Sequence, residues 1–171
     1  MDENNIRRAL MRISHEILEK NETGRDLCVI GIKSRGVALG AVICENLKSL
    51  GADVNFGTID ITHYRDDRTE LSETRINNSE ISFDINGKTV ILVDDVLFTG
   101  RTTRAAIDAV LAIGRPKKIQ LAVLVDRGHR EFPIKADYTG KNVPTSHSEA
   151  IKVSIPPYDS ETNVKIIHVK G

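Results

Sequence analysis

The chain has little cysteine and no excess of charge of either sign, and each shortage excludes a class of protein. Its 171 residues include two cysteines, Cys28 and Cys44, and neither has a second cysteine at CxxC spacing. We therefore predict buried, reduced thiols rather than a redox pair or a cysteine-ligated metal. Lys plus Arg and Asp plus Glu both number 24, so the net charge is zero. Generic polyanion binders have a strong basic excess, which this chain lacks.

Long apolar stretches are also missing. No apolar run approaches the ~20 residues that a membrane-spanning helix needs. The opening MDENNIRRAL has no apolar core of the kind found in signal peptides. We therefore expect a cytoplasmic protein without membrane contact. Hydrophobic residues make up 40% of the chain, which is enough for the core of one domain.

The sequence does contain an alternation of predicted strands and helices. Apolar spacing and terminal glycines predict helices over residues 3–19, 37–51 and 101–114. Short apolar or alternating runs predict strands over residues 27–32, 54–64, 88–95 and 118–126. The polar stretch 65–80 has no apolar period, and long loops of this kind are often functional lids. The alternation indicates an α/β fold with a mostly parallel sheet, whose ligands bind beyond the carboxyl ends of the strands.

The most informative stretch is VILVDDVLFTGRTT, residues 90–103. It runs from an apolar strand through two adjacent acids into a Thr-Gly-Arg-Thr turn before a helix. Free N–H groups at a helix start bind phosphate, and Gly100 allows close approach of the backbone. Asp94 and Asp95 repel phosphate, but they can accept hydrogen bonds from a diol or hold a divalent metal through water. This pattern indicates a ribose 5-phosphate ligand rather than a plain helix cap.

Two further loops that follow predicted strands are rich in cations. GIKSRG, residues 31–36, places Lys33, Ser34 and Arg35 between two glycines, which suits a second anion. The loop after residues 118–126 is basic as well, and its basic residues are Arg127, His129, Arg130, Lys135 and Lys141. Spacing alone favours a solvated basic face for this group.

These motifs resemble a known family. VILVDDVLFTGRT is similar to the phosphoribosyl pyrophosphate (PRPP) signature of type I phosphoribosyltransferases, and GIKSRG resembles their pyrophosphate loop. The stretches NIRRALMRISHEI, IDITHYRDD and GRPKKIQLAVLVDRGHREFPIKADYTGKNVPTS resemble one subfamily. Its members are pyrimidine operon attenuation regulators that also have uracil phosphoribosyltransferase activity. The resemblance extends from Ile6 to Ser146.

The resemblance implies a fold and a reaction. The fold would be a single phosphoribosyltransferase domain over residues 1–171: a type I core, with a mostly parallel sheet flanked by helices, a small hood and a flexible lid loop. The reaction would convert uracil and PRPP to UMP and pyrophosphate. Mg²⁺ would bind mainly through PRPP, near Asp94 and Asp95. The transition state of such transfers is like an oxocarbenium ion and needs positioning and charge stabilisation more than a nucleophile.

The resemblance also assigns roles to residues. Asp94 and Asp95 would bind the ribose hydroxyls, and together with Arg35 they are the catalytic candidates. The residues that would surround the 5-phosphate are Val96, Leu97, Phe98, Thr99, Gly100, Arg101, Thr102 and Thr103. The pyrophosphate would contact Lys33, Ser34 and Arg35, and Arg127 would lie by the base or nucleotide. The lid would include Tyr64, Arg65, Asp66 and Asp67.

A second implied role is binding of the leader mRNA of the pyrimidine operon when UMP or UTP is bound, which promotes transcription termination. Residues 101–141 contain nine basic and four acidic residues, a net charge of +5, whereas residues 53–95 contain four and ten, a net charge of −6. Such segregation suits a local polyanion-binding surface. The resemblance places the RNA-binding residues at His15, Arg130, Lys135 and Lys141, with Arg8 and Arg12 nearby.

Some of these expectations stay open. Met11 replaces a threonine that family members often have in the first helix, which weakens the RNA assignment at that point. A homodimer or higher homo-oligomer is expected because an RNA hairpin needs a broader surface than one small domain supplies. The alternatives are a salvage enzyme without an RNA-binding role and a phosphoribosyltransferase for a purine base. The PRPP motif does not exclude a purine base, although VDRGHREFP disfavours it.

Overall fold

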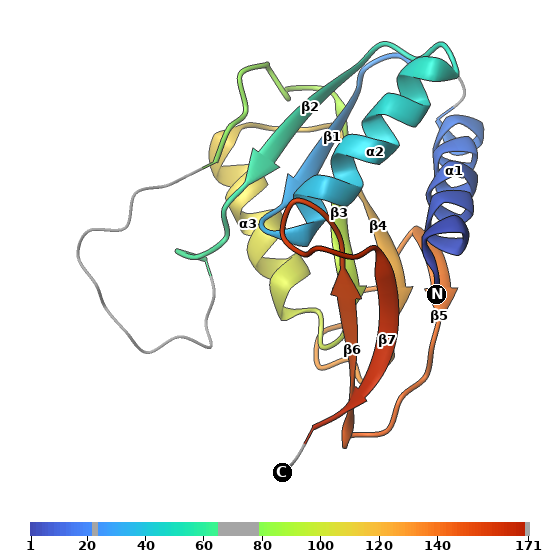
Figure 1. The fold of residues 1–171 in the computed structure, drawn as a ribbon. Coiled ribbons are helices and arrows are strands. Elements are labelled where there is room, and N and C mark those ends of the chain that lie inside the picture. The colour runs from blue at the N-terminus through green and yellow to red at the C-terminus, as the bar shows by residue number, and fades with distance from the viewer. Residues whose placement is uncertain (22–23, 65–78, 170–171) are drawn as a thin grey trace.

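A five-stranded sheet forms the centre of the computed structural model, which describes residues 1–21, 24–64 and 79–169 (Figure 1). The strand order is β2-β1-β3-β4-β5, and every neighbouring pair is parallel. The strands are β1 (Leu27–Ile32), β2 (Val54–Ile59), β3 (Thr89–Leu97), β4 (Lys118–Asp126) and β5 (Tyr138–Asn142). The predicted α/β architecture with a parallel sheet is therefore confirmed.

Three helices cover the two faces of the sheet. They are α1 (Glu3–Lys20), α2 (Arg35–Ser49) and α3 (Arg101–Ile113). Helices α1 and α2 pack on one face and α3 on the other (Figure 1). A separate antiparallel hairpin, β6 (Glu149–Ser154) and β7 (Asn163–His168), is the small hood. None of the helices in the described part of the chain is long and apolar enough to cross a membrane.

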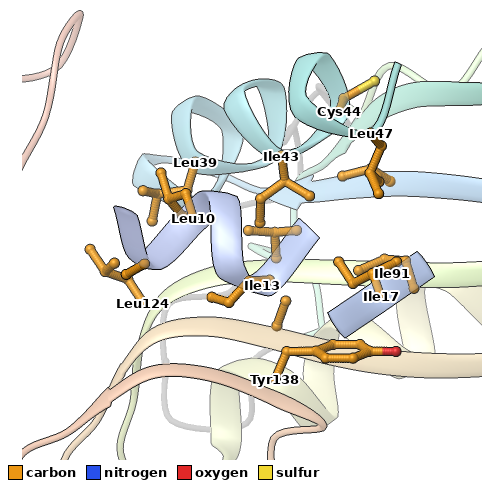
Figure 2. Packing of buried hydrophobic residues seen from close by; sticks show 14 of the residues in the cluster. Leu10, Ile13, Ile17, Leu39, Ile43, Cys44, Leu47, Ile91, Leu124 and Tyr138 are labelled. Atoms are coloured by element: carbon orange, nitrogen blue, oxygen red, sulfur yellow. The ribbon is translucent and has the colours of Figure 1, made fainter. Parts of the chain in front are cut away.

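Strands β1, β3 and β4 are mainly apolar because both of their faces are buried. All six residues of β1 are buried, and its side chains alternate between the two core clusters. Figure 2 shows the first cluster, which includes Ile13 and Ile17 of α1, Ile43 of α2 and Ile91 of the sheet. The second cluster packs the opposite face of the sheet against α3. Two-sided burial explains why these strands have no polar alternation.

The two cysteines are free thiols inside these clusters, as predicted. Burial raises the pKa of Cys28 to about 11, despite the opposing charge of Lys88. Burial also raises the pKa of Cys44. Both groups are therefore neutral and structural at physiological pH.

Most predicted elements are confirmed, with one clear error in the second strand. The strand predicted over residues 54–64 ends at Ile59. Asp60 accepts hydrogen bonds from the backbone N–H and the hydroxyl of Thr62 (3.0 and 2.6 Å), and Tyr64 N–H donates to the carbonyl oxygen of Ile61 (2.9 Å). These local bonds form a turn that competes with strand pairing. The next strand along the chain, predicted over residues 88–95, extends to Leu97.

Candidate functional site

The site lies where β1 and β3 end side by side. In this strand order, the helix that follows β1 (α2) and the helix that follows β3 (α3) cover opposite faces, which opens a crevice at the carboxyl ends of the two strands. The two motifs that the sequence analysis predicts to bind anions lie at the ends of β1 and β3. The sheet topology therefore brings together two segments that are about 60 residues apart in the chain.

Gly36 controls how closely these two loops approach. A β-carbon at Gly36 would lie 2.4 Å from the carbonyl oxygen of Val93, within β3. Any side chain would therefore push the start of α2 away from the acidic pair that follows Val93. The glycine allows Lys33, Ser34 and Arg35 to lie beside Asp94 and Asp95.

These residues line a common hollow of about 450 Å³. It combines the three residues of loop 33–35 with three carboxylates and neighbouring polar groups. Its lining residues are Lys33, Ser34, Arg35, Asp60, Ile61, Thr62, Asp94, Asp95, Val96 and Thr102. The Lys33–Ser34 peptide bond is cis, and Lys33 N–H donates to the carbonyl oxygen of Ile59 (3.0 Å). The hollow thus combines cations for an anionic group with acids for hydroxyls or a developing positive charge.

The two adjacent acids are held by backbone hydrogen bonds. Oδ1 of Asp94 accepts from the N–H of Asp95 (2.9 Å), and Oδ1 of Asp95 accepts from the N–H of Val96 (2.8 Å). Asp94 is only 8% exposed. Burial raises the pKa of Asp95, although the backbone bonds and the charge of Arg35 act in the opposite direction. Both carboxyl groups are therefore held by backbone N–H groups of the last residues of β3.

A second hollow of about 260 Å³ adjoins the first. It is lined by eight consecutive residues: Val96, Leu97, Phe98, Thr99, Gly100, Arg101, Thr102 and Thr103. Val96 and Thr102 line both hollows, so the two are contiguous. The eight residues predicted to surround a phosphate thus form one cavity at the start of α3.

The start of α3 provides the anion-binding groups of this second hollow. Gly100 is the N-cap residue, has a φ of +92°, and provides no side-chain cap for the helix. A β-carbon on Gly100 would also come within 3.2 Å of Cβ of Phe132. Uncapped N–H groups at a helix start attract phosphate. Glycine is required here because a side chain would be strained and would crowd Phe132.

Asp60 and Asp159 are two polar residues at the site that the sequence analysis missed. Burial alone would raise the pKa of Asp60, but hydrogen bonds from Thr62 and the charge of Lys33 lower it. Asp60 directly follows β2, so the rule that functional residues follow strands would have found it, had that strand been predicted to end at Ile59. Asp159 forms an ion pair with Arg35, and no local sequence signal indicated that contact.

Arg127 connects the loop after β4 to the hood. Its Nε donates to Oγ1 of Thr145 (2.9 Å), and its Nη2 donates to the carbonyl oxygen of Glu149 (2.6 Å). The guanidinium also stacks 4.0 Å from the ring centroid of Phe98, which lines the second hollow. His129 lies in the same loop, and its Nε2 is 2.6 Å from the carbonyl oxygen of Thr145. Arg127 therefore lies next to the second hollow. Its guanidinium is already hydrogen-bonded to Thr145 and Glu149 and stacked on Phe98.

Tyr64 is half-buried, and it is the only one of the four predicted lid residues within the described part of the chain. Arg65, Asp66 and Asp67 lie outside the described residues.

Some of the predicted RNA-binding residues gather between α1 and β5. Arg8, Arg12 and Lys141 line a hollow of about 670 Å³, and Arg12 Nη2 donates to the carbonyl oxygens of Thr139 (3.2 Å) and Gly140 (2.7 Å). His15 and Lys135 are exposed. Arg130 differs, because its guanidinium donates to Asp126 and to the carbonyl oxygens of Phe98 (2.8 Å), Gly128 (3.3 Å) and Ile134 (2.8 Å).

A divalent cation would fit the acidic pair only with help from a ligand. Within the described residues, no group of three or more His, Cys, Asp or Glu side chains is arranged to bind a metal ion. Asp94 and Asp95 offer hard oxygen atoms of the kind that Mg²⁺ prefers, and Mg²⁺ usually keeps several waters or substrate oxygens. The donor set therefore fits an ion that arrives with a phosphorylated substrate.

Comparison with known proteins identifies the class. The phosphoribosyl transferase domain family matches residues 2–159, and the chain belongs to this family. The fold is that of hypoxanthine phosphoribosyltransferases. One is the Trypanosoma cruzi enzyme with a K68R substitution in a ternary substrates complex. It matches this chain with a TM-score of 0.73 at 18% identity, over 99% of this chain and 92% of that chain. A 1.4 Å crystal structure of the T. cruzi enzyme gives a TM-score of 0.73 at 19% identity, over 99% and 95% of the two chains.

Curated relatives place the chain more narrowly. It is 57% identical to the bifunctional protein PyrR of Caldicellulosiruptor bescii, over 97% of this chain and 92% of the relative. It is 54% identical to the bifunctional protein PyrR of Clostridioides difficile, over 97% and 95% of the two chains. Within the phosphoribosyltransferases, the chain is a member of the PyrR family.

Proposed function

We propose that this chain transfers the phosphoribosyl group of PRPP to uracil, giving UMP and pyrophosphate, and that it also regulates a pyrimidine operon by binding its leader mRNA. The observation that supports the transfer is the pair of contiguous hollows that share Val96 and Thr102. One offers helix N–H groups to a phosphate, and the other offers cations together with the acidic pair, which directly precedes the shared Val96. PRPP has the matching order of 5-phosphate, ribose diol and pyrophosphate.

Each part of PRPP has a binding group in this arrangement. The 5-phosphate binds the N–H groups and threonine hydroxyls at the start of α3. Asp94 and Asp95 accept hydrogen bonds from the ribose hydroxyls. Lys33, Ser34 and Arg35 bind the pyrophosphate. Asp94 and Asp95 would help to hold the Mg²⁺ that comes with PRPP, and the ion would offset the charge of the pyrophosphate.

The reaction needs charge stabilisation more than a nucleophile from the protein. The bond from C1′ of the ribose to the pyrophosphate oxygen breaks, and a bond from C1′ to N1 of uracil forms. N1 loses its proton, and the pyrophosphate leaves with the electron pair of the broken bond. Positive charge develops on the ribose and negative charge on the leaving group, which the fixed carboxylates and the cationic loop would stabilise. Because the acids are held by backbone bonds, they need no rearrangement as the charge develops.

The base and the regulatory role are supported by family membership. The relatives are named bifunctional, which agrees with a catalytic role combined with a regulatory one. The RNA surface would lie between α1 and β5 around Arg8, Arg12 and Lys141, and His15 and Lys135 are further exposed candidates. A homodimer would widen that surface enough for an RNA hairpin. Residues 1–171 would act as one domain in the cytoplasm.

The transfer is tested by incubating the purified chain with PRPP, Mg²⁺ and a panel of bases. We expect UMP from uracil and little product from hypoxanthine or guanine. Faster turnover of a purine base would favour the alternative that the PRPP motif leaves open. No product from any base would contradict the transfer.

Regulation is tested by filter binding of the operon's leader transcript with and without UMP, using a scrambled hairpin as the control at fixed salt. We expect UMP to tighten binding to the true leader alone. Equal, salt-sensitive binding to both transcripts would leave a salvage enzyme without an RNA-binding role.

A further inference from the structure

A two-pronged ion pair joins the pyrophosphate loop to the hood. Nε of Arg35 donates to Oδ2 of Asp159 (2.9 Å), and Nη2 of Arg35 donates to Oδ1 of Asp159 (3.0 Å). The two residues are 124 positions apart in the chain. Such a fork fixes the plane of the guanidinium as well as its position. Their side chains are 32% and 19% exposed, so the pair is shielded from water more than most surface pairs.

The carboxylate of Asp159 is itself held by its own turn. Its Oδ2 accepts a second hydrogen bond from the N–H of Ile155 (3.0 Å), and the N–H of Asp159 donates to the carbonyl oxygen of Ile155 (3.0 Å). Ile155 is buried in the core cluster together with Val153 and Val164. The hydrogen bonds from Arg35 and Ile155 lower the pKa of Asp159. Asp159 is therefore an ionised group fixed to the packed end of the hood.

The hood is in turn attached to the rest of the molecule on two sides. Met1 and Val164 exchange hydrogen bonds, one from the terminal amine (2.7 Å) and one to the carbonyl oxygen of Met1 (2.9 Å). Arg127 binds the carbonyl oxygen of Glu149 at the start of β6 (2.6 Å). These attachments hold the hairpin against α1 and against the loop after β4. Asp159 therefore has a fixed position relative to the site.

The ion pair leaves one edge of the Arg35 guanidinium for a ligand. Asp159 occupies the edge formed by Nε and one N–H of Nη2. Across residues 1–21, 24–64 and 79–169, Nη1 and the second N–H of Nη2 have no hydrogen-bond partner. A planar guanidinium can bind one anion along each edge. Arg35 also lines the hollow with Lys33 and Ser34, where the pyrophosphate is proposed to bind.

The geometry points to Asp159 as a positioning residue that orients Arg35 for the pyrophosphate of PRPP. This inference rests on the proposed function, because it assigns the ligand of Arg35. An arginine that rotates freely loses conformational entropy when it binds an anion, whereas one already held by a fork loses less. Charge acts in the opposite direction, since a nearby carboxylate weakens the attraction of Arg35 for an anion. If Asp159 orients Arg35, removing its charge weakens pyrophosphate binding. If Asp159 only competes with the anion, removing its charge strengthens pyrophosphate binding.

The first experiment measures binding of magnesium pyrophosphate to the full chain by titration calorimetry. Asp159→Asn keeps the size of the side chain and an oxygen for the Ile155 N–H, but removes the charge that holds Arg35. We expect pyrophosphate to bind roughly two- to tenfold more weakly, with UMP binding unchanged. Glu161→Gln is the matched control, because Glu161 lies in the same segment and pairs with exposed Lys165 (3.4 Å). Unchanged or tighter pyrophosphate binding in Asp159→Asn would overturn the inference.

A double-mutant cycle checks that Asp159 acts through Arg35. In an Arg35→Ala background, we expect Asp159→Asn to cause no further loss of pyrophosphate affinity. Independent, additive losses would overturn the positioning role. The result is separable from the proposed function. A wild-type chain that makes no UMP but shows this coupling contradicts only the transfer, and one that makes UMP without the coupling contradicts only the role of Asp159.

Discussion

Gly36 lies against Val93 so closely that a β-carbon on Gly36 would be 2.4 Å from the Val93 carbonyl oxygen. This contact joins the start of α2 to β3, and Asp94 follows directly after Val93 in that strand. The loop of Lys33, Ser34 and Arg35 lies beside Asp94 and Asp95 because a glycine occupies this position. Local packing at one residue thus determines the geometry of the whole hollow.

Replacing this glycine tests that relationship. Gly36→Ala forces a carbon into an occupied space, so we expect a loss of about 1–3 kcal/mol in the free energy of unfolding together with a raised KM for PRPP. Urea unfolding and initial-rate kinetics measure the two effects. Gly51→Ala is the control, since Gly51 has a φ of +91° but open space around it. It should lose stability through backbone strain while keeping the wild-type KM, and an unchanged KM in Gly36→Ala would contradict the packing argument.

Removing the charge of the acidic pair tests its role in catalysis. Asp94→Asn combined with Asp95→Asn keeps the size of both side chains but removes the charge that would stabilise the ribose cation. We expect turnover of uracil and PRPP to fall by at least about 100-fold, with circular dichroism showing a folded chain. Leader RNA binding measured without UMP should persist, because the basic hollow beside α1 is separate from this pair. Wild-type turnover in the double variant would disprove the site assignment.

The surface between α1 and β5 yields a prediction about salt dependence. Arg8→Ala with Lys141→Ala removes two charges from that hollow. Leader RNA should bind more weakly, and the slope of log affinity against log salt should decrease by about 1–2. Lys117→Ala with Lys118→Ala removes the same charge from a hollow at the opposite ends of the strands and should change binding little. Equal effects in both double variants would mean that only net charge matters.

Arg130 is a poor choice for that RNA test. Its guanidinium donates to the carbonyl oxygen of Phe98 (2.8 Å), which lines the proposed 5-phosphate hollow. Arg130→Ala should therefore raise the KM for PRPP as well as affect RNA. A variant that binds RNA weakly with wild-type kinetics would show that the loop keeps its shape without these bonds.

The buried thiol of Cys28 predicts a dependence of stability on pH. Its pKa is raised from 9.0 to about 11 in the folded chain. Above pH 9 the unfolded chain loses this proton while the folded chain keeps it, so stability falls as pH rises. Relative to Cys28→Ala, the wild-type free energy of unfolding should fall by about 1.4 kcal/mol per pH unit between the two pKa values. Urea unfolding at pH 8, 9 and 10 measures this slope, and parallel curves for the two proteins would contradict the burial of an ionisable thiol.

The sequence by itself determined the elements and the chemistry of the individual loops. Apolar spacing along α1 and the two-sided apolar runs of β1 and β4 are local patterns, so they were readable without the fold. The order of apolar strand, Asp94, Asp95 and Gly100 likewise lies within a dozen residues. The Thr-Gly-Arg-Thr turn leads directly into α3 in the chain. A phosphate site built from such consecutive backbone groups can therefore be predicted from the sequence.

Tertiary structure alone decided which distant residues complete those loops. Asp60 belongs to the hollow because a hydrogen-bonded turn ends β2 early, which weak alternation over residues 54–64 concealed. Asp159 lies 124 residues after Arg35 in the chain and reaches it only because the hood packs against the core. Arg130 binds backbone oxygens instead of remaining on an open basic surface. Local periodicity reports the burial of each segment, whereas contacts between segments depend on how the buried faces pack together.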